Sequence, residues 1–146
     1  MKKILFLIAM VMCSVQFGLA SDVVTRDVNQ LPVAAREMII KQFPQSKVSY
    51  IKIEKDLFQS PSYDVKLSDG IELEFNSNGE WVEIDCKNQS VPDAFIPKTI
   101  SKYMNDNYNG HKMVKIERDR KGYEVTLDNG LEVDFDQFGA FLKLSD

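Results

Sequence analysis

Apolar and polar residues alternate along several short stretches of the chain, a pattern typical of strands that bury one face. In residues 71–75, for example, Ile71, Leu73 and Phe75 alternate with glutamates. Asp-Gly and Asn-Gly pairs separate the stretches, because glycine tolerates the positive φ that tight hairpin turns need. In the first half of the chain this pattern predicts four antiparallel strands, at residues 47–55, 63–67, 71–75 and 80–85.

A helix is predicted ahead of these strands. Leu31-Pro32 indicates its start, since proline fits the first helical turn, and Pro44 marks its end. Four apolar residues recur at helical spacing and form one stripe: Ala35, Met38, Ile39 and Phe43. Residues 21–29 are polar and mixed in character, and we expect them to be a flexible lead-in.

The strand pattern is then repeated. Residues 123–145 align with residues 63–85 without a gap, so that Phe75 matches Phe135 and Trp81 matches Phe141. An internal repeat of this length constrains the architecture more than any other feature of the sequence. We also match the strand that starts at Met113 with the stretch that starts at Tyr50.

The second helix has two candidate starts. Ile96-Pro97 corresponds to Leu31-Pro32, whereas Val91-Pro92 offers a competing entry with Asp93 as an N-cap. We prefer Ile96-Pro97, because it keeps the distance to the next strand nearly the same in both halves. The apolar stripe of this helix would consist of Ile100, Tyr103, Met104 and Tyr108.

Each half is therefore predicted to be one helix followed by a four-stranded meander, the first over residues 30–86 and the second over residues 91–146. A unit of this size buries too little surface to be stable alone. The sequence predicts an α+β domain over residues 21–146, in which the repeats join into one eight-stranded antiparallel sheet. Both helices would cover one face, and the other face would stay open to solvent.

The first twenty residues predict export. Lys2 and Lys3 precede an apolar run, and small residues end at Ala20, as in a cleaved signal peptide. The alternative, a transmembrane anchor, needs about 20 apolar residues, more than the run provides. We therefore expect residues 1–20 to be a signal peptide, no membrane span in the mature protein, and a periplasmic or secreted location.

The charge of the mature chain argues against nucleic acid as a partner. Without Lys2 and Lys3, 16 of the 18 basic side chains remain against 22 acidic ones, a net charge of −6. Nucleic acid would require a basic patch. Of the two cysteines, Cys13 leaves with the signal peptide, so Cys86 is left alone. We interpret it as a half-buried small hydrophobe; the alternative is an intermolecular disulfide or a reactive thiol.

The sequence contains no motif that selects a reaction. His111 is the only histidine, and no nucleophile elbow or phosphate-binding glycine loop is present. The acidic alternations around Glu72 and Glu132 could hold calcium, but on a strand such residues are usually the solvated face. Any two of the 22 acids could also form a glycosidase-like pair, and nothing selects one. We predict no enzymatic activity, no cofactor and no metal site.

Four residues are candidates for binding. By strand parity Trp81 and Phe141 point onto the open face, away from four apolar residues expected to point inward: Val82, Ile84, Leu142 and Leu144. Large aromatic side chains on a solvated sheet face are candidate binding anchors, although each could instead cover its own hairpin. Their expected companions on the open face, by the same parity, are Tyr50 and Met113.

The chain resembles the PepSY-like family of secreted bacterial proteins. The resemblance rests on Leu-Pro, a helix, Phe-Pro and a strand, followed by Tyr-Asp-Val-x-Leu-x-Asp-Gly-x-Glu-x-x-Phe-x-x-x-Gly-x-Trp from Tyr63 to Trp81. It recurs in the second half, where Asn109 replaces the proline and Phe141 the tryptophan. The family is similar in fold to β-lactamase inhibitor protein, and related domains in peptidase propeptides are thought to inhibit peptidases.

This resemblance implies a non-catalytic binding protein, an inhibitor or modulator of a secreted hydrolase or peptidase that uses the open sheet face. The alternative is a periplasmic sensor or carrier that binds a small ligand between the sheet and the helices. An unrecognised enzyme is a third reading, which a cluster of acids with perturbed pKa values in a cleft would favour.

Overall fold

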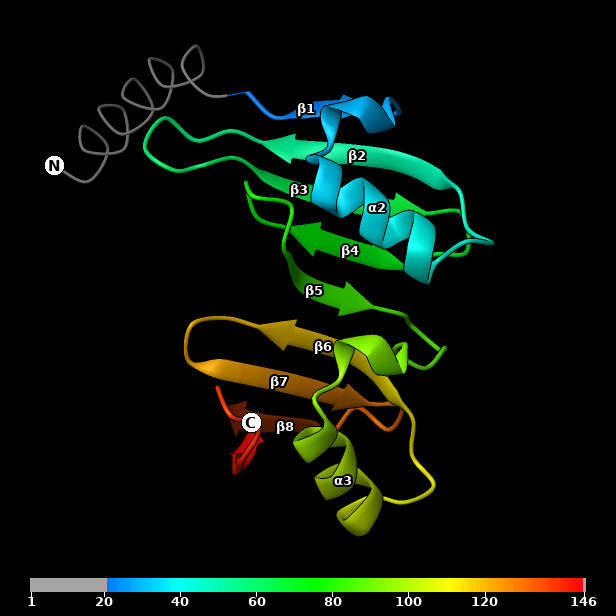
Figure 1. The fold of residues 1–146 in the computed structure, drawn as a ribbon, viewed down its shortest axis with the longest axis vertical. Helices are drawn as coiled ribbons and strands as arrows, with labels where there is room; N and C mark the ends of the chain where they lie inside the picture. Colours follow the sequence, from blue (N-terminus) through cyan, green and yellow to red (C-terminus); the bar gives the residue numbers. More distant parts are fainter. Residues whose placement is uncertain (1–20, 146) are drawn as a thin grey trace, which may run out of the picture.

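The computed structural model describes residues 21–145, so the predicted signal peptide lies outside the described residues. One antiparallel sheet runs through the whole molecule, with its strands in the order of the sequence (Figure 1). The first half contains β1 (Val23–Thr25), η1 (Val28–Gln30), α2 (Val33–Gln42), β2 (Val48–Glu54), β3 (Ser62–Leu67), β4 (Glu72–Phe75) and β5 (Trp81–Asp85). The second half contains η2 (Asp93–Phe95), α3 (Lys98–Asn107), β6 (Met113–Arg118), β7 (Gly122–Leu127), β8 (Glu132–Asp136) and β9 (Phe141–Ser145).

The sheet has nine strands within residues 21–145, not the predicted eight. The additional strand, β1, lies in the segment expected to be a flexible lead-in. Its three residues are β-branched and pair with β2, with Val23 opposite Ile53 and Thr25 opposite Ile51. Three residues are too few to show an alternating pattern, which is why the sequence did not reveal this strand.

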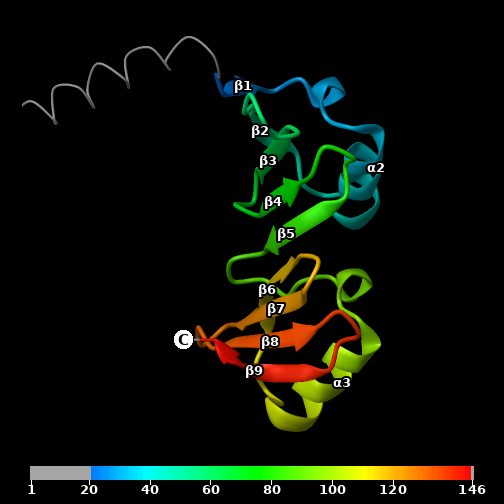
Figure 2. The same cartoon turned by 90° about the vertical axis from the view of Figure 1, so that its left-hand side faces the viewer.

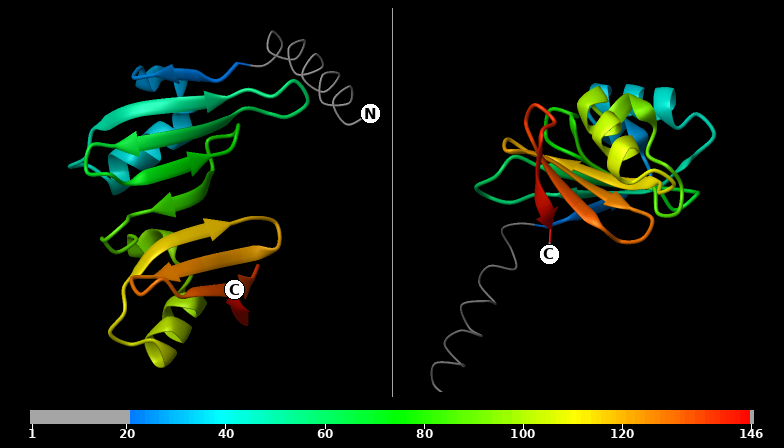
Figure 3. Two further views of the ribbon diagram at one scale, coloured as in Figure 1. Left: turned by 180° about the vertical axis from the view of Figure 1, so that it is seen from behind. Right: turned by 90° about the horizontal axis from the view of Figure 1, so that it is seen from below.

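Both helices cover the same face of the sheet (Figures 2 and 3). Each begins directly after a Leu-Pro or Ile-Pro pair, with Pro32 and Pro97 as N-caps. The preferred start of the second helix is thus confirmed, and the competing Val91-Pro92 pair precedes the short η2 instead. The predicted apolar stripes face the sheet, with Ala35, Ile39, Ile100 and Met104 buried.

The hydrophobic core lies between the helices and the sheet. Its largest fully buried side chains include Phe75 and Phe135, which occupy matching positions in β4 and β8. Both pair in the same way with the preceding strand, Phe75 with Tyr63 and Phe135 with Tyr123. The predicted burial of every second residue along these strands is confirmed.

The match between Tyr50 and Met113 is wrong by two residues. Val65 pairs with Ile51, and the equivalent Val125 pairs with Ile116, so Ile116 corresponds to Ile51. Tyr50 therefore corresponds to Lys115, and Val48 to Met113. Both strands have an irregularity at this point, which supports the corrected match. The stretches that start at Tyr50 and Met113 are similar in sequence, but the pairing with β3 and β7 shows which residues are equivalent.

The two halves join through β5 and β6, edge to edge as predicted. Three residue pairs form this junction: Glu83 with Glu117, Ile84 with Ile116, and Asp85 with Lys115. Ile84 and Ile116 are both fully buried, so the core continues across the junction.

Candidate functional site

The sheet face opposite the helices carries a row of acidic side chains. Its members are directly opposite one another on six adjacent strands, from β3 to β8. We call the following residues the acidic row: Asp64, Glu74, Glu83, Glu117, Glu124 and Asp134. Lysines lie at its two ends, Lys52 opposite Asp64 and Lys143 opposite Asp134. Like charges placed directly opposite each other destabilise a sheet, so this arrangement costs stability in the free protein.

The next row along the strands has mixed charges instead. There Glu72 lies between two lysines, with its carboxylate 3.1 Å from the Lys66 ammonium and 2.8 Å from that of Lys87. Lys87 also reaches Asp85 at 2.6 Å. These ion pairs hold the pKa of Glu72 below its usual value, mainly through the hydrogen bond from Lys87. The accumulation of one sign is therefore specific to the acidic row.

The centre of the acidic row is a group of three glutamates at the junction of the two halves. Burial raises the pKa of Glu83 to about 7, and a hydrogen bond with Glu117 adds to the effect. The pKa of Glu124 is also raised to about 7, by burial and by its own hydrogen bond with Glu117. Burial would raise the pKa of Glu117 too, but these two hydrogen bonds and Lys115 lower it. Glu117 thus accepts hydrogen bonds from the protonated carboxyl groups of Glu83 and Glu124.

Two lysines and a hydroxyl group partly compensate the negative charge of the acidic row; one of the lysines, Lys143, lies 3.8 Å from Asp134. The Lys115 ammonium lies 3.6 Å from Glu83 and 3.3 Å from Glu117. At the other end, Ser145 Oγ donates to Asp134 at 2.6 Å and lies 3.3 Å from a Glu124 oxygen. Farther along the row, burial raises the pKa values of Asp64 and Glu74. The row therefore holds more negative charge than its surroundings neutralise.

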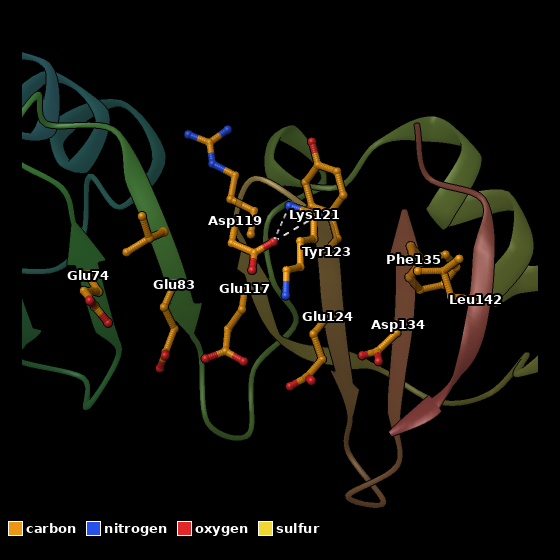
Figure 4. Close-up of a pocket in the computed structure, with 13 residues that line it drawn as sticks. Glu74, Glu83, Glu117, Asp119, Lys121, Tyr123, Glu124, Asp134, Phe135 and Leu142 are labelled. Atoms are coloured by element: carbon orange, nitrogen blue, oxygen red, sulfur yellow. Dashed lines mark hydrogen bonds between the residues drawn. The ribbon is translucent and has the colours of Figure 1, made fainter. Parts of the chain in front are cut away.

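A groove of about 500 Å³ lies over the second half of the acidic row. Figure 4 shows the carboxylates of Glu74, Glu83, Glu117, Glu124 and Asp134 side by side, each from a different strand. The rest of the groove is lined in part by apolar and basic residues: Val82, Leu142, Tyr123, Lys121 and Arg118. This mixture suits a ligand surface with cationic groups and some apolar area.

Among residues 21–145, no three acidic, histidine or cysteine side chains are arranged to hold a metal ion. None of the helices in that part of the chain has the length and apolar character needed to cross a membrane.

Trp81 does not lie on the open face, contrary to the prediction. Glu74 pairs with Glu83 but Phe75 pairs with Trp81, so three residues of β5 lie opposite two of β4. The extra residue of this β-bulge, Val82, lines the groove of the open face, and Trp81 is returned to the side of the core. A β-bulge reverses the strand parity on which the prediction depended.

The Trp81 ring is held in two contacts. It meets the Phe95 ring edge to face, with the centroids 5.6 Å apart. The guanidinium carbon of Arg118 lies 3.9 Å from the centroid of the Trp81 ring. Gly79, at φ +80, precedes this strand, and a Cβ there would lie 2.8 Å from Pro32 Cβ. The hairpin that carries Trp81 therefore packs directly onto α2.

Phe141 is placed by the same irregularity in the second half. Phe135 pairs with Phe141 whereas Val133 pairs with Leu144, so Leu142 is the extra residue. The Phe141 ring stacks on Tyr103 of α3, with the centroids 4.9 Å apart and the planes at 9°. Phe141 therefore also faces the helix side, and Leu142, expected to point inward, lines the groove of the open face.

The other two candidates separate. Tyr50 is exposed and lines a groove of about 300 Å³ beside the acidic row, together with Asp64, Glu74 and Glu83. Met113 is half-buried and packs against the core. The prediction that Trp81, Phe141 and Met113 lie on the open face is wrong. A role in binding for these three residues and Tyr50 stays a prediction.

The acidic row was missed by sequence reasoning. The sequence shows alternating acids around Glu72 and Glu132, but within a single strand such acids fit an ordinary solvated face. Glu83, Glu117 and Glu124 come from three different strands, and only the pairing between strands brings them together. The signal available in the sequence is the repeat, which places acids at two pairs of equivalent positions, Asp64 with Glu124 and Glu74 with Asp134.

Two other residues singled out from the sequence have structural roles. His111 is exposed, and its Nδ1 lies 2.8 Å from Asp128 Oδ1 in the turn that links β7 and β8. Cys86 is 1% exposed and belongs to the core, so it is a small hydrophobe that is buried more completely than expected.

Comparisons with known proteins agree with this fold. A family described as beta-lactamase-inhibitor-like and PepSY-like matches residues 61–143. The chain is similar to a periplasmic protein of unknown function from Bacteroides vulgatus, with 81% identity and a TM-score of 0.84 over 86% of this chain and 100% of that one. No functionally curated protein matches the sequence.

Two more distant relatives have the same architecture. One is a periplasmic protein from Bacteroides thetaiotaomicron for which calcium regulation has been suggested; it is 41% identical, with a TM-score of 0.80 over 86% of this chain and 97% of that one. The other is a second periplasmic protein from Bacteroides vulgatus, 43% identical, with a TM-score of 0.80 over 86% and 98%. The predicted periplasmic or secreted location is thus confirmed, and the chain belongs to the PepSY-like family of beta-lactamase-inhibitor-like proteins.

Proposed function

We propose that the protein is a non-catalytic binding protein whose open sheet face receives a basic surface of another periplasmic or secreted protein. The observation that carries the proposal is the acidic row. Six carboxylates in direct opposition repel one another in the free protein. Basic groups of a partner would relieve this repulsion, so that part of the lost stability returns as binding free energy.

The family description supports a partner that is itself an enzyme. Within this proposal the protein inhibits or modulates a secreted hydrolase or peptidase by covering a basic surface of it. Tyr50, which lines the smaller groove beside the acidic row, would add an aromatic contact at the edge of the interface. Val82 and Leu142 would supply apolar contacts over the larger groove.

Glutamates with raised pKa values in a groove also suit acid–base catalysis. A catalytic pair, however, would explain two of the six carboxylates, whereas an extended binding surface explains the whole row across β3 to β8. The breadth of the row is the reason for preferring binding over catalysis.

A small-ligand sensor is the second candidate function, and calcium is the ligand that the observations favour. Carboxylate oxygens are the ligands that calcium prefers, and calcium regulation has been suggested for the relative from Bacteroides thetaiotaomicron. No three carboxylates within residues 21–145 are arranged to hold a metal ion, so calcium would have to draw neighbouring members of the acidic row together. It would then compete with a basic partner.

The proposal can be tested with a lysine octapeptide as the probe, in calorimetric titrations at low salt. We expect the triple variant Glu83→Gln/Glu117→Gln/Glu124→Gln to lose about tenfold in affinity, since each exposed ion pair contributes roughly 0.2–1 kcal/mol. The matched control changes three exposed carboxylates outside the row, Asp56→Asn/Asp93→Asn/Asp106→Asn. Equal losses in the two variants would show that only net charge matters, and would contradict the proposal.

The same titrations distinguish the second candidate. Calcium at about 1 mM, the upper range for extracellular calcium modules, should displace the peptide if the row is a calcium sensor. If the triple variant still shows heat of calcium binding in these titrations, then calcium binds outside the acidic row.

A further inference from the structure

The outer side of α2 is apolar, unlike the outer side of α3. A groove of about 490 Å³ runs along α2, between this helix, η1 and the start of β2. Three exposed apolar side chains border it: Val28 at 41% exposure, Val33 at 58% and Ile40 at 72%. Val33 and Ile40 are seven residues apart, so they lie on the same side of the helix.

The second half provides an internal comparison for this surface. The helix caps Pro32 and Pro97, and Phe43 and Tyr108, show that each residue around α2 corresponds to the one 65 positions later. The three apolar residues Val28, Val33 and Ile40 thereby correspond to Asp93, Lys98 and Asn105. These counterparts are exposed as well, and all three are polar. Exposed apolar residues are thus not required by the helix position, which indicates that they have a separate role.

Two opposite charges lie between Val33 and Ile40 on this side of α2. Glu37 is exposed, and within residues 21–145 it takes part in no ion pair. Arg36 donates from Nη1 to Asn29 Oδ1 at 3.0 Å, while its Nε is buried without a partner in the described part of the chain. An acid and a base adjacent in sequence make a surface that is complementary to itself.

We propose that the outer side of α2 binds a second copy of this chain. Two α2 helices that run antiparallel about a two-fold axis place Val33 of one copy opposite Ile40 of the other. The same register places Arg36 opposite Glu37 twice, once on each side of the axis. Apolar contacts and charge pairs are thus satisfied together, as expected of an interface in which both copies use the same patch.

The proposed interface between the two copies is small, so we expect the dimer to be weak. A helix of ten residues is about 15 Å long, so two such helices and η1 bury less than the ~1,200 Å² of a standard interface. The association should therefore be weak and depend on protein concentration.

Sedimentation equilibrium of the protein purified from the periplasmic fraction tests this proposal. We expect the average mass to rise from monomer toward dimer over about 0.01–1 mM, a range suited to a weak interface. The variant Val33→Lys/Ile40→Asn carries the residues that α3 has at these positions, so it should fold and stay monomeric. Leu57→Lys/Phe58→Asn makes the same chemical change at two exposed apolar residues of the β2–β3 loop and should dimerise normally.

A charge exchange tests the antiparallel register. Glu37→Arg alone should weaken the dimer, because on each side of the axis the new arginine faces Arg36 of the other copy. The double variant Arg36→Glu/Glu37→Arg should restore it. A wild-type protein that stays monomeric at the highest concentration would overturn the proposal. So would a Val33→Lys/Ile40→Asn variant that dimerises as well as the wild type, or a double charge exchange that fails to restore association.

Discussion

Arg118 contacts both the backbone and the ring of Trp81 across the junction of the two halves. Its Nε donates a 2.7 Å hydrogen bond to the Trp81 carbonyl oxygen, while its guanidinium carbon lies 3.9 Å from the centroid of the Trp81 ring. Arg118 belongs to β6 and Trp81 to β5, so the pair adds a side-chain connection to the three backbone pairs of the junction.

This pair should be measurable in a double-mutant cycle. Trp81→Ala is expected to cost about 2–3 kcal/mol, less than the ~3–5 kcal/mol of a fully buried aromatic residue, because the ring is half-buried. Arg118→Ala should cost about 1–2 kcal/mol through the lost hydrogen bond and the lost cation–π contact. Urea unfolding of both single variants and of the double variant should show a coupling of about 1 kcal/mol. Trp81→Ala keeps the backbone carbonyl oxygen that accepts from Arg118, so the coupling measures the contact between the ring and the guanidinium, and additive effects would contradict that contact.

Phe75→Ala should be among the most damaging single changes. Phe75 is fully buried beneath the helices, so its truncation removes apolar contacts and leaves a cavity, at a cost of about 3–5 kcal/mol. Phe138→Ala is the control, because that ring is 77% exposed and its loss should stay within about 0.5 kcal/mol. Comparable losses in the two variants, measured by chemical unfolding, would contradict the assignment of the core.

Stability should fall as pH rises from about 5 to 8. The pKa values of Glu83 and Glu124 are raised to about 7 in the folded state, against about 4.3 in an unfolded chain. Between these values the folded state binds more protons, so its stability is present at low pH and is lost as pH passes through 7. After allowance for solvent screening, the two groups together should account for about 1–2 kcal/mol.

The variants Glu83→Gln and Glu124→Gln should each reduce this slope and raise stability at pH 8, where they remove a repelling charge. Asp106→Asn, an exposed carboxylate on α3 paired only with Lys102, should leave the slope unchanged. If stability depends on pH in both glutamine variants as it does in the wild type, then the pKa values of Glu83 and Glu124 are not raised in the folded protein.

Cys86 should be unreactive until the protein unfolds. Burial raises the pKa of its thiol to about 12, and the charges of Asp85 and Asp69 add to the effect. The thiolate fraction at pH 8 is then about a thousandfold below that of an ordinary cysteine, and labelling by a thiol reagent should slow accordingly. Labelling in denaturant provides the control, and rapid labelling of the native protein would contradict the burial of this residue.

The two halves are predicted to unfold as one unit. Ile84 and Ile116 meet across the junction and are both fully buried, so neither half has a complete core alone. A fragment of residues 21–90 should be unfolded or self-associated, by circular dichroism and sedimentation. A folded, monomeric fragment would show that residues 30–86 form a domain of their own.

The fold could be predicted because its signals are local. Leu-Pro and Ile-Pro pairs mark both helices, and alternation with glycine turns marks eight of the strands. The predicted faces of Trp81 and Phe141 are wrong because one extra residue interrupts the alternation along each strand. The β-bulges at Val82 and Leu142 turn these two rings to the opposite face of the sheet. A sequence pattern with a period of two contains no sign of such an insertion, because the bulged residues are themselves apolar.

The acidic row could not be predicted for a different reason. Each glutamate alone fits the polar side of its strand, and the site exists only through the register between strands. Glu83 and Glu117 come from different halves, so even a correct prediction within each repeat would not have brought them together.

The order of strands in the sheet equals their order in the chain, and this has a consequence for how the protein folds. Every strand finds its partners among its immediate neighbours, so contacts are mostly short in sequence, which favours fast folding for a β-rich chain. A polypeptide that enters the periplasm from its N-terminus can extend the sheet strand by strand as it emerges, without waiting for a distant segment. Strand β9 (Phe141–Ser145) then completes the edge, and a chain truncated before it would keep an extendable sheet with β8 newly uncovered.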